Sequence, residues 1–307
     1  MTNLELVSTA SNILENYLKV KMGEKVLLIN DHEPNPVYDA FKLALASRGA
    51  EAKEITLSEK RKPSEPIPQC LGDLEWADVI IAPTKQSVTH CPETRKAEEG
   101  GARIITLPGI TGEIFLKVQK ADFNGIWKME EHLLSNLKGK ESITIKTGSG
   151  TDISFSVKGR PWESSKPDYL KGFVHNLPTG EVFCAPVEDS ANGKIAIDYW
   201  KDILKPKNKA WLIVKNGKII EWNEAAKPFI EHQSAENGLI IAEFGIGTNK
   251  AHKKPVGNIL HDEKIYGSCH IAFGNNTSFG GKNASAVHSD IILMKPKIAA
   301  DGKALKW

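Results

Sequence analysis

The chain has 307 residues, a formal net charge of +2, 40% hydrophobic residues and 25% charged residues. These values are typical of an ordinary soluble globular protein with one large domain or two. Acidic and basic residues are mixed along the chain, which argues against a nucleic acid or another polyanion as its partner. No apolar run approaches the roughly 20 residues that span a bilayer, so we expect no membrane association.

The cellular compartment is predicted from the N-terminus and the cysteines. The first residues lack the basic and apolar parts of a signal peptide. Four cysteines lie far apart and form no Cys-x-x-Cys pair: Cys70, Cys91, Cys184 and Cys269. This usage is typical of small buried hydrophobic residues in a reducing cytoplasm rather than of a disulfide framework. We therefore predict a cytoplasmic protein.

The first 140 residues alternate between helical and strand patterns. Helices are expected over residues 3–20, 34–49 and 91–99, and strands over 24–29, 50–57, 77–83 and 102–106. Such alternation predicts a parallel sheet with right-handed crossovers, and hence a three-layer α/β domain over residues 1–140. A helical pattern then runs from Glu113 to Lys138, in two pieces broken near Asn124-Gly125.

The turn after the first expected strand bears on nucleotide binding. Residues 30–36 contain no glycine, whereas a dinucleotide site needs glycines there so that the backbone can approach the pyrophosphate. We therefore exclude a dinucleotide-binding domain. His32 and Glu33 lie at the carboxyl end of this strand, where α/β sheets often bind ligands. The favoured alternative is a solvated turn that caps the next helix.

Residues 141–307 are richer in short strands and turns, which predicts a strand-rich α+β second domain. Strands are expected over residues 142–146, 151–156, 195–200, 210–214 and 218–222, and a helix over 224–236. The first two strands flank Thr147-Gly-Ser-Gly150 and form a hairpin, and the last two are joined by the Lys215-Asn-Gly217 turn.

Histidines and carboxylates interrupt the last strands of this domain. Within Gly267–Gly274, alternation places His270 on the face opposite Cys269, and in the following strand His288 and Asp290 share one face. Two imidazoles and a carboxylate on neighbouring strands can bind a divalent metal. A surface role, or a role satisfied within the core, is the alternative for these residues.

Two glutamates precede them. Glu181 stands where the turn Pro178-Thr-Gly180 enters a strand, and Glu243 interrupts the apolar run Leu239–Gly247. A carboxylate inside an apolar strand is costly unless it is paired or bound to a metal. The two glutamates are therefore further candidate ligands.

Four segments, in this order, resemble the aminopeptidase T / aminopeptidase S family of metallopeptidases. They are "NLPTGEVFCAPVEDS", "AEFGIGTN", "DEKIYGSCHIAFG" and "GGKNASAVHSD", and the resemblance covers about residues 170–295. It implies a thermophilic metalloprotease-like fold and a homodimer that encloses the active sites. It also implies that the metal ligands are Glu181, Glu243, His270, His288 and Asp290.

The number of metals is predicted from charge. Three carboxylates carry about three negative charges, and the two histidines bind metal as neutral rings. One dication leaves the cluster negative, whereas two leave it slightly positive and suit a carbonyl oxygen and a hydroxide. We therefore expect two divalent ions, Zn, Co or Mn. The predicted function is a metal-dependent aminopeptidase-like hydrolase that removes N-terminal residues from peptides through a metal-activated water.

Two alternatives stay open. If only His270, His288 and Asp290 converge, the site is the two-histidine, one-carboxylate triad of non-haem iron oxygenases. The 2,5-dihydroxypyridine dioxygenases, ring-cleaving enzymes with one Fe(II), resemble the same peptidase family and would act on a small molecule. Moreover, Thr277 stands where the family's aminopeptidases carry a tyrosine, seven residues past the first metal-binding histidine. The other alternative is a binding protein that keeps the metal site without turnover.

Overall fold

The computed structural model describes residues 2–63, 65–118 and 121–307, and its contacts divide into two compact units. Unit 1 comprises Met1–Phe123 and Lys166–Thr179, and unit 2 comprises Asn124–Ser165 and Gly180–Trp307. From the sequence we predict two consecutive domains with one boundary at residue 140. In the structure that boundary falls inside unit 2, and a later segment returns to unit 1 because its strand extends the first sheet.

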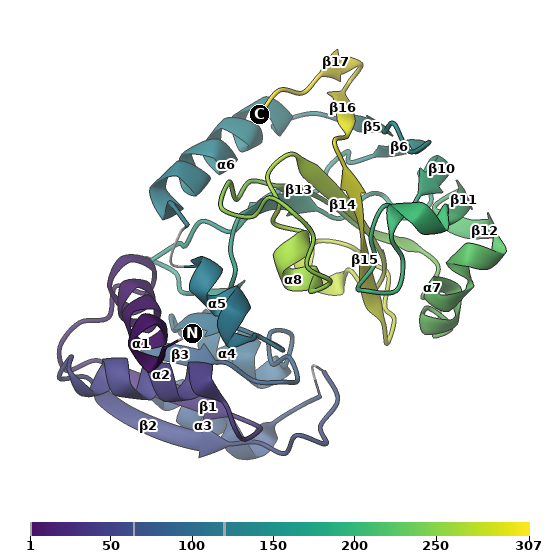
Figure 1. Cartoon of the computed structure of the whole chain (residues 1–307). Coiled ribbons are helices and arrows are strands. Elements are labelled where there is room, and N and C mark those ends of the chain that lie inside the picture. Colours follow the sequence, from purple (N-terminus) through teal and green to yellow (C-terminus); the bar gives the residue numbers. More distant parts are fainter. Residues whose placement is uncertain (1, 64, 119–120) are drawn as a thin grey trace. The chain divides into compact units, whose positions relative to one another are not determined.

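Unit 1 is built on a five-stranded parallel sheet in the order β2-β1-β3-β4-β8 (Figure 1). The strands are β1 (Lys25–Asn30), β2 (Glu51–Thr56), β3 (Val79–Ala82), β4 (Arg103–Thr106) and β8 (Phe173–Asn176). The first four agree with the prediction. β8 was not predicted, because it is only four residues long and follows a loop rich in proline and lysine.

Helices cover both faces of this sheet. On one face lie α1 (Asn3–Asn12), its π-helical continuation (Ile13–Tyr17), α2 (Pro36–Ala46) and α5 (Gly112–Val118), which pack together. On the other face, α3 (Leu71–Trp76) and α4 (Pro92–Glu99) contribute Leu74 and Ala97 to a core shared with Leu27 and Ile104 of the sheet. The predicted three-layer α/β arrangement is confirmed.

The turn after β1 uses its polar residues to hold the fold. The Asp31 carboxylate accepts hydrogen bonds from the backbone N–H groups of Lys85 (2.6 Å) and Gln86 (2.9 Å), and His32 pairs with the same carboxylate. The Asn35 side chain caps α2 by accepting from the N–H of Tyr38. This arrangement supports the interpretation of the segment as a turn that caps a helix.

Unit 2 contains two antiparallel sheets (Figure 1). The larger has the order β12-β11-β10-β6-β5-β16-β17 and the smaller β15-β14-β13-β9-β7. The larger sheet is formed by β5 (Ser142–Lys146), β6 (Asp152–Ser156), β10 (Asn192–Ala196), β11 (Trp211–Lys215), β12 (Lys218–Trp222), β16 (Lys297–Ala300) and β17 (Lys303–Ala304). The smaller is formed by β7 (Glu163–Ser164), β9 (Glu181–Cys184), β13 (Ile241–Gly247), β14 (Ser268–Gly274) and β15 (His288–Met294).

The two sheets share one hydrophobic core. It includes Ile145 and Phe155 of the larger sheet and Phe244 and Ile271 of the smaller one, all almost fully buried. Cys269 and Phe273 also face this core, so the predicted alternation in β14 is confirmed and His270 points to the opposite face. The second domain is strand-rich, as predicted. All four cysteines are free and buried.

The helices of unit 2 differ from the prediction in their ends. The two helical pieces expected over 113–138 are α5 (Gly112–Val118) and α6 (Phe123–Leu137), so Asn124 and Gly125 lie in the first turn of α6, just after the break. Residues 119–120 lie outside the described part. The helix expected over 224–236 is a 3-10 turn (Glu224–Ala226) followed by α7 (Lys227–His232). Pro228 lies in the first turn of α7, where no backbone N–H is needed. A short α8 (Ile259–Asp262) was not predicted.

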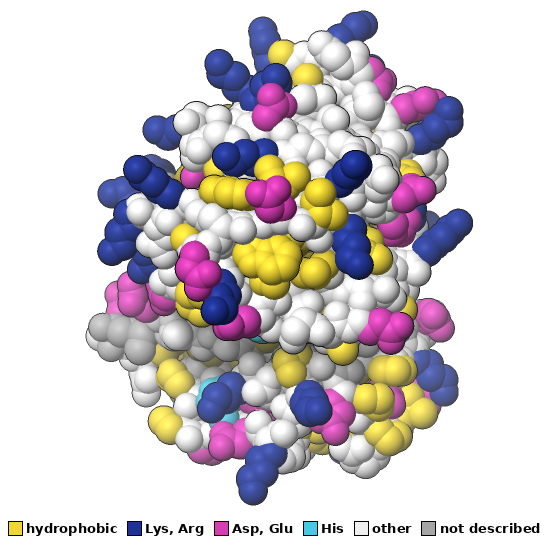
Figure 2. All heavy atoms as spheres, turned by 90° about the vertical axis from the view of Figure 1, so that its right-hand side faces the viewer, with side chains coloured by type: hydrophobic (Ala, Val, Ile, Leu, Met, Phe, Trp, Pro, Cys, Tyr) yellow, Lys and Arg dark blue, Asp and Glu magenta, His cyan; other side chains and the backbone are white. Residues whose placement is uncertain are grey.

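The distribution of surface charge and the length of the apolar helices are relevant to nucleic acids and membranes as partners. Figure 2 shows one face of the molecule, on which lysine and arginine side chains are interspersed with carboxylates. Among the described residues, no helix is both long and apolar enough to cross a membrane.

A carboxyl group lies inside unit 2, on α6. Glu130 is fully buried and accepts hydrogen bonds from the hydroxyls of Ser165 and Thr248 (3.2 Å for Thr248). Ser165 Oγ in turn accepts from the backbone N–H groups of Gly180 (3.0 Å) and Glu181 (3.3 Å), at the start of β9. Burial raises the pKa of Glu130 to about 8 and outweighs the two hydroxyl hydrogen bonds, which lower it.

The raised pKa predicts a pH dependence of stability. The folded state keeps a proton on Glu130 that the unfolded state releases above its ordinary pKa of 4.5. The stability that Glu130 contributes to the folded state is therefore complete below pH 4.5 and is lost as pH rises to about 8. Over this range the free energy of unfolding should fall by up to about 1.4 kcal/mol per pH unit. In urea unfolding from pH 5 to 8.5, Glu130→Gln should lose this slope, while Glu131→Gln on the exposed face should keep it. Equal slopes in the wild type and Glu130→Gln would contradict the assignment.

Candidate metal site

The five side chains predicted as ligands lie together on one face of the smaller sheet. Glu181 comes from β9, Glu243 from β13, His270 from β14, and His288 and Asp290 from β15. Strand register brings them together, because Ala272 of β14 stands opposite both Glu243 and Asp290. Across the small alanine side chain, donor oxygens of Glu243 and Asp290 lie within 4.8 Å of each other.

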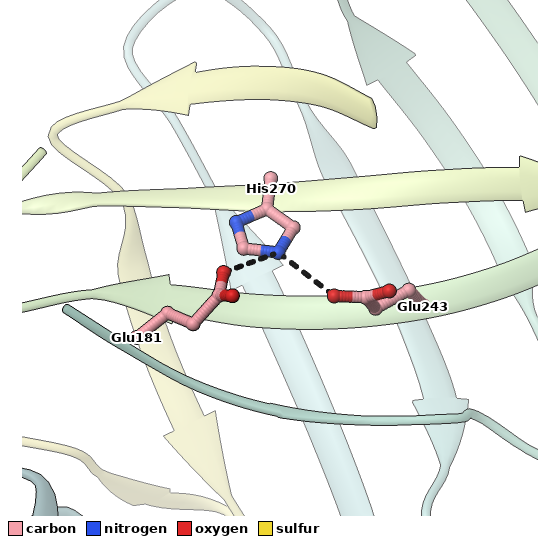
Figure 3. A group of neighbouring side chains, drawn as sticks. All are labelled: Glu181, Glu243 and His270. Carbon is pink, nitrogen blue, oxygen red and sulfur yellow. Dashed lines mark hydrogen bonds and ion pairs between the residues drawn. The ribbon is translucent and has the colours of Figure 1, made fainter. Parts of the chain in front are cut away.

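A first group forms around His270 (Figure 3). Its Nε2 atom lies 3.1 Å from Glu243 Oε1 and 3.6 Å from Glu181 Oε2, between the two carboxylates. The ring lies against the backbone of Gly245, where a Cβ atom would stand only 2.1 Å from Nε2. Glycine at position 245 is therefore required for this orientation of the imidazole.

A second group forms around His288. Its Nε2 atom lies 3.3 Å from Glu243 Oε2 and 3.6 Å from Asp290 Oδ1. Its Nδ1 atom lies 2.7 Å from the carbonyl oxygen of Asn275. Because a carbonyl only accepts, Nδ1 carries the proton and Nε2 is the nitrogen that faces the carboxylates, an orientation common among metal-binding histidines.

Glu243 belongs to both groups. One of its oxygens faces His270 and the other faces His288. Within each group, Glu181–Glu243–His270 and Glu243–His288–Asp290, one donor atom from each residue lies within 4.8 Å of the others. A carboxylate shared in this way can bind one cation or bridge two.

Two residues next to these groups were not predicted. Lys264 Nζ donates hydrogen bonds to Glu181 Oε1 and, at 2.6 Å, to Glu263 Oε1, and only 1% of its side chain is exposed. Both residues follow α8 in the segment Asp-Glu-Lys-Ile-Tyr-Gly, which in sequence is typical of a solvated turn. The segment begins "DEKIYGSCHIAFG", one of the four stretches that resemble the metallopeptidase family, and this resemblance could have signalled a role at the site.

The site is closed at one end and open at the other. His270 is fully buried, and Glu181, Glu243 and Asp290 keep only 13%, 10% and 11% of their side-chain surface exposed. His288, by contrast, keeps 31% exposed. The cluster is therefore exposed to solvent on the His288 side.

Without metal, protons balance the charge of the cluster. Burial opposes the charged form of His270, but the hydrogen bond to Glu243 and the charges of Glu181, Glu243 and Asp290 outweigh it and raise the pKa to about 9. The pKa of His288 is also raised, since the Asp290 and Glu243 carboxylates outweigh the desolvation of its ring. The pKa of Glu243 is lowered, because its hydrogen bonds to both imidazoles outweigh its burial.

The donor set fits a divalent cation. Glu181 Oε2 is buried and has no hydrogen-bond partner among the residues that the structure describes, although it faces His270. A buried carboxylate oxygen without a donor is costly, and positive charge beside it, on the His270 ring or on a bound cation, lowers that cost. Imidazole nitrogens and carboxylate oxygens are ligands common to Zn, Mn and Fe(II).

Two polar features near the site serve the loop between β14 and β15. Glu188 accepts hydrogen bonds from Asn276 (3.2 Å) and from the N–H of Lys282 (2.6 Å), and it pairs with Arg160. Thr277, in the 3-10 turn Thr277–Phe279, donates its hydroxyl to Asn275 Oδ1 at 3.0 Å. Glu188 thus holds the loop that carries Asn275, the partner of His288.

The sequence of this chain is similar to those of known proteins. A family model described as thermophilic metalloprotease (M29) matches residues 107–305. The 2,5-dihydroxypyridine 5,6-dioxygenase of Pseudomonas putida KT2440 is 24% identical over 251 residues, which are 76% of this chain and 70% of that protein.

Two solved structures share the fold. The structure of the 2,5-dihydroxypyridine dioxygenase from the same Pseudomonas strain matches with a TM-score of 0.82 at 19% identity, over 99% of this chain and 96% of the other. Wild-type AmpT from Thermus thermophilus matches with a TM-score of 0.70 at 15% identity, over 98% and 97% of the two chains.

The raised histidine pKa values predict that metal binding releases protons. A cation needs neutral imidazole rings, and in the metal-free protein these are protonated up to about pH 9 for His270. Below that pH, affinity should rise with pH by about tenfold per unit for each proton displaced. Calorimetric titration of metal-free protein with Zn²⁺ at pH 7.5, in buffers of different ionisation enthalpy, should give at least about one proton released per cation. A heat of binding independent of the buffer would show that the histidine rings are not protonated in the metal-free protein, contrary to this prediction.

Proposed function

Because the chain belongs to the thermophilic metalloprotease (M29) family, we propose that it is a metal-dependent hydrolase that removes N-terminal residues from peptides. The observation that carries the proposal is the convergence of two imidazoles and three carboxylates on one sheet face, with Glu243 shared between them. The cytoplasmic location and the homodimer stay predictions of the sequence.

The residues have separate roles in this proposal. Glu181, Glu243, His270, His288 and Asp290 would offer their carboxylate oxygens and Nε2 atoms to one or two divalent ions, in the two groups that share Glu243. When bound, a divalent cation supplies a Lewis acid that polarises a carbonyl and lowers the pKa of water towards neutrality. A histidine that binds the cation does so as a neutral ring. With a single ion bound, the three carboxylates leave the cluster negative, and this charge attracts the free ammonium group of a peptide N-terminus.

The chain also determines where a substrate would enter and how the His288 ring is oriented. The exposed edge of His288 marks the side from which a substrate would enter. The carbonyl of Asn275 fixes the tautomer of this ring, so its Nε2 stays directed at Glu243 and Asp290. The burial of His270 and Glu243 excludes bulk water from the inner end and strengthens electrostatic interactions there.

A second candidate function is ring cleavage by a non-haem iron dioxygenase. It is favoured by the 24% identity to a 2,5-dihydroxypyridine 5,6-dioxygenase over most of both chains. It is also favoured by Thr277, whose hydroxyl is held by Asn275 in place of the tyrosine expected in an aminopeptidase. In this case His270, His288 and Asp290 would supply the two-histidine, one-carboxylate ligand set for Fe(II).

A pair of assays separates the two functions. Purified protein should hydrolyse an amino-acid amide with a free N-terminus in Zn²⁺, Co²⁺ or Mn²⁺, and the N-acetylated amide should be inert because it lacks the ammonium group. The same protein, loaded with Fe²⁺ under reducing conditions, should consume no oxygen with 2,5-dihydroxypyridine. Oxygen uptake without amide hydrolysis would overturn the peptidase proposal and support the dioxygenase.

Replacing Glu243 by Gln keeps the shape of the side chain and removes its charge. As the carboxylate shared by both groups, Glu243 should be essential, and the variant should lose at least about a hundredfold in kcat/KM for the amide. Glu221→Gln, the same change on the exposed strand β12, is the matched control and should retain activity. A Glu243→Gln variant as active as this control would exclude Glu243 from the metal site.

A further inference from the structure

Lys264 supplies a positive charge at the closed end of the site. Its Nζ atom donates to Glu181 and Glu263, and its side chain is 1% exposed. The backbone on either side is fixed as well, since Lys264 N donates to His261 O (3.2 Å) and Lys264 O accepts from Asn249 N (2.9 Å). A lysine held this way cannot swing out to solvent without breaking both ion pairs.

The ammonium group occupies oxygens that a second metal would need. Glu181 Oε1 is bound to Lys264, which leaves only Oε2 for a cation beside His270. Glu263, the other carboxylate at this end, is bound to the same ammonium. A dication in the Glu181–Glu243–His270 group would therefore lie next to a buried positive charge, and like charges repel strongly where water is excluded.

The other half of the cluster has no such neighbour. The donor atoms of Glu243, His288 and Asp290 face one another, and none of the three forms an ion pair with a lysine or arginine among the described side chains. This half is also the one that opens to solvent at His288. Cation and substrate can therefore meet there.

We propose that Lys264 is a built-in cation of this site, so that the chain binds one divalent ion tightly, at Glu243, His288 and Asp290, and disfavours a second ion at Glu181 and His270. The proposal rests on the proposed metal site and refines it. It differs from the two ions that carboxylate charge alone predicts, because that count omits the ammonium group.

Metal stoichiometry tests the proposal directly. Metal-free wild-type protein titrated with Zn²⁺ by calorimetry, and checked by elemental analysis after desalting, should hold one ion per chain. Lys264→Met removes the charge and frees both glutamates, so a second ion should bind at least about tenfold more tightly than in the wild type. Lys53→Met, which removes a lysine paired with Asp73 in unit 1, should behave as the wild type.

The outcomes are distinct. Two ions of equal affinity in the wild type, or a single ion in Lys264→Met, would overturn the role of Lys264 and leave the metal site standing. A wild type that binds no ion would overturn both the site and the inference.

A second pair of variants covers the case in which Lys264→Met does not fold. Glu181→Gln keeps an amide oxygen for Lys264 and should retain the tight ion within about threefold, whereas Asp290→Asn should weaken it by about a hundredfold or more. The reverse order would place the tight ion beside Lys264 and contradict the proposal.

Discussion

Carboxylates gathered on a sheet face that water hardly reaches are the constraint on which the rest of unit 2 depends. Glu181, Glu243 and Asp290 on this face would repel one another and Glu263, which follows α8 beside them, and each loses hydration that only cations or strong donors can replace. The positive partners in the structure are the rings of His270 and His288 and the ammonium of Lys264. Metal binding exchanges ring protons for a dication and leaves the ammonium in place.

The packing of the two sheets of unit 2 against one shared core makes such a cluster possible. The strands that carry the ligands present their other side to the core shared with the larger sheet, where Phe244 and Ile271 are fully buried. That packing fixes the register, and register alone aligns Glu243 with Asp290 across Ala272. A site built on paired strands is held more rigidly than one built on loops. The buried Glu130, through Ser165, ties α6 to the start of β9 and so to Glu181.

Alternation in the sequence predicted which side of β14 and β15 carries the ligands, because the side-chain period of a strand is two whatever surrounds it. The convergence of Glu181 and Glu243 with these strands needed the order of the motifs in addition, since strand pairing is not local. Lys264 escaped prediction because a lysine in a charged turn is ordinarily solvated, and its burial depends on contacts made only in the folded chain. The strand β8 was not predicted for a similar reason, because its four residues are stabilised as a strand by pairing with β4.

We expect a divalent ion to bind on this face of the smaller sheet. Crystals of metal-free protein soaked in Zn²⁺, with diffraction recorded on either side of the zinc absorption edge, would test it most directly. One strong anomalous peak should lie within ligand distance, about 2 Å, of Glu243, His288 and Asp290. An anomalous map without a peak at these residues, or with its main peak elsewhere on the chain, would contradict it.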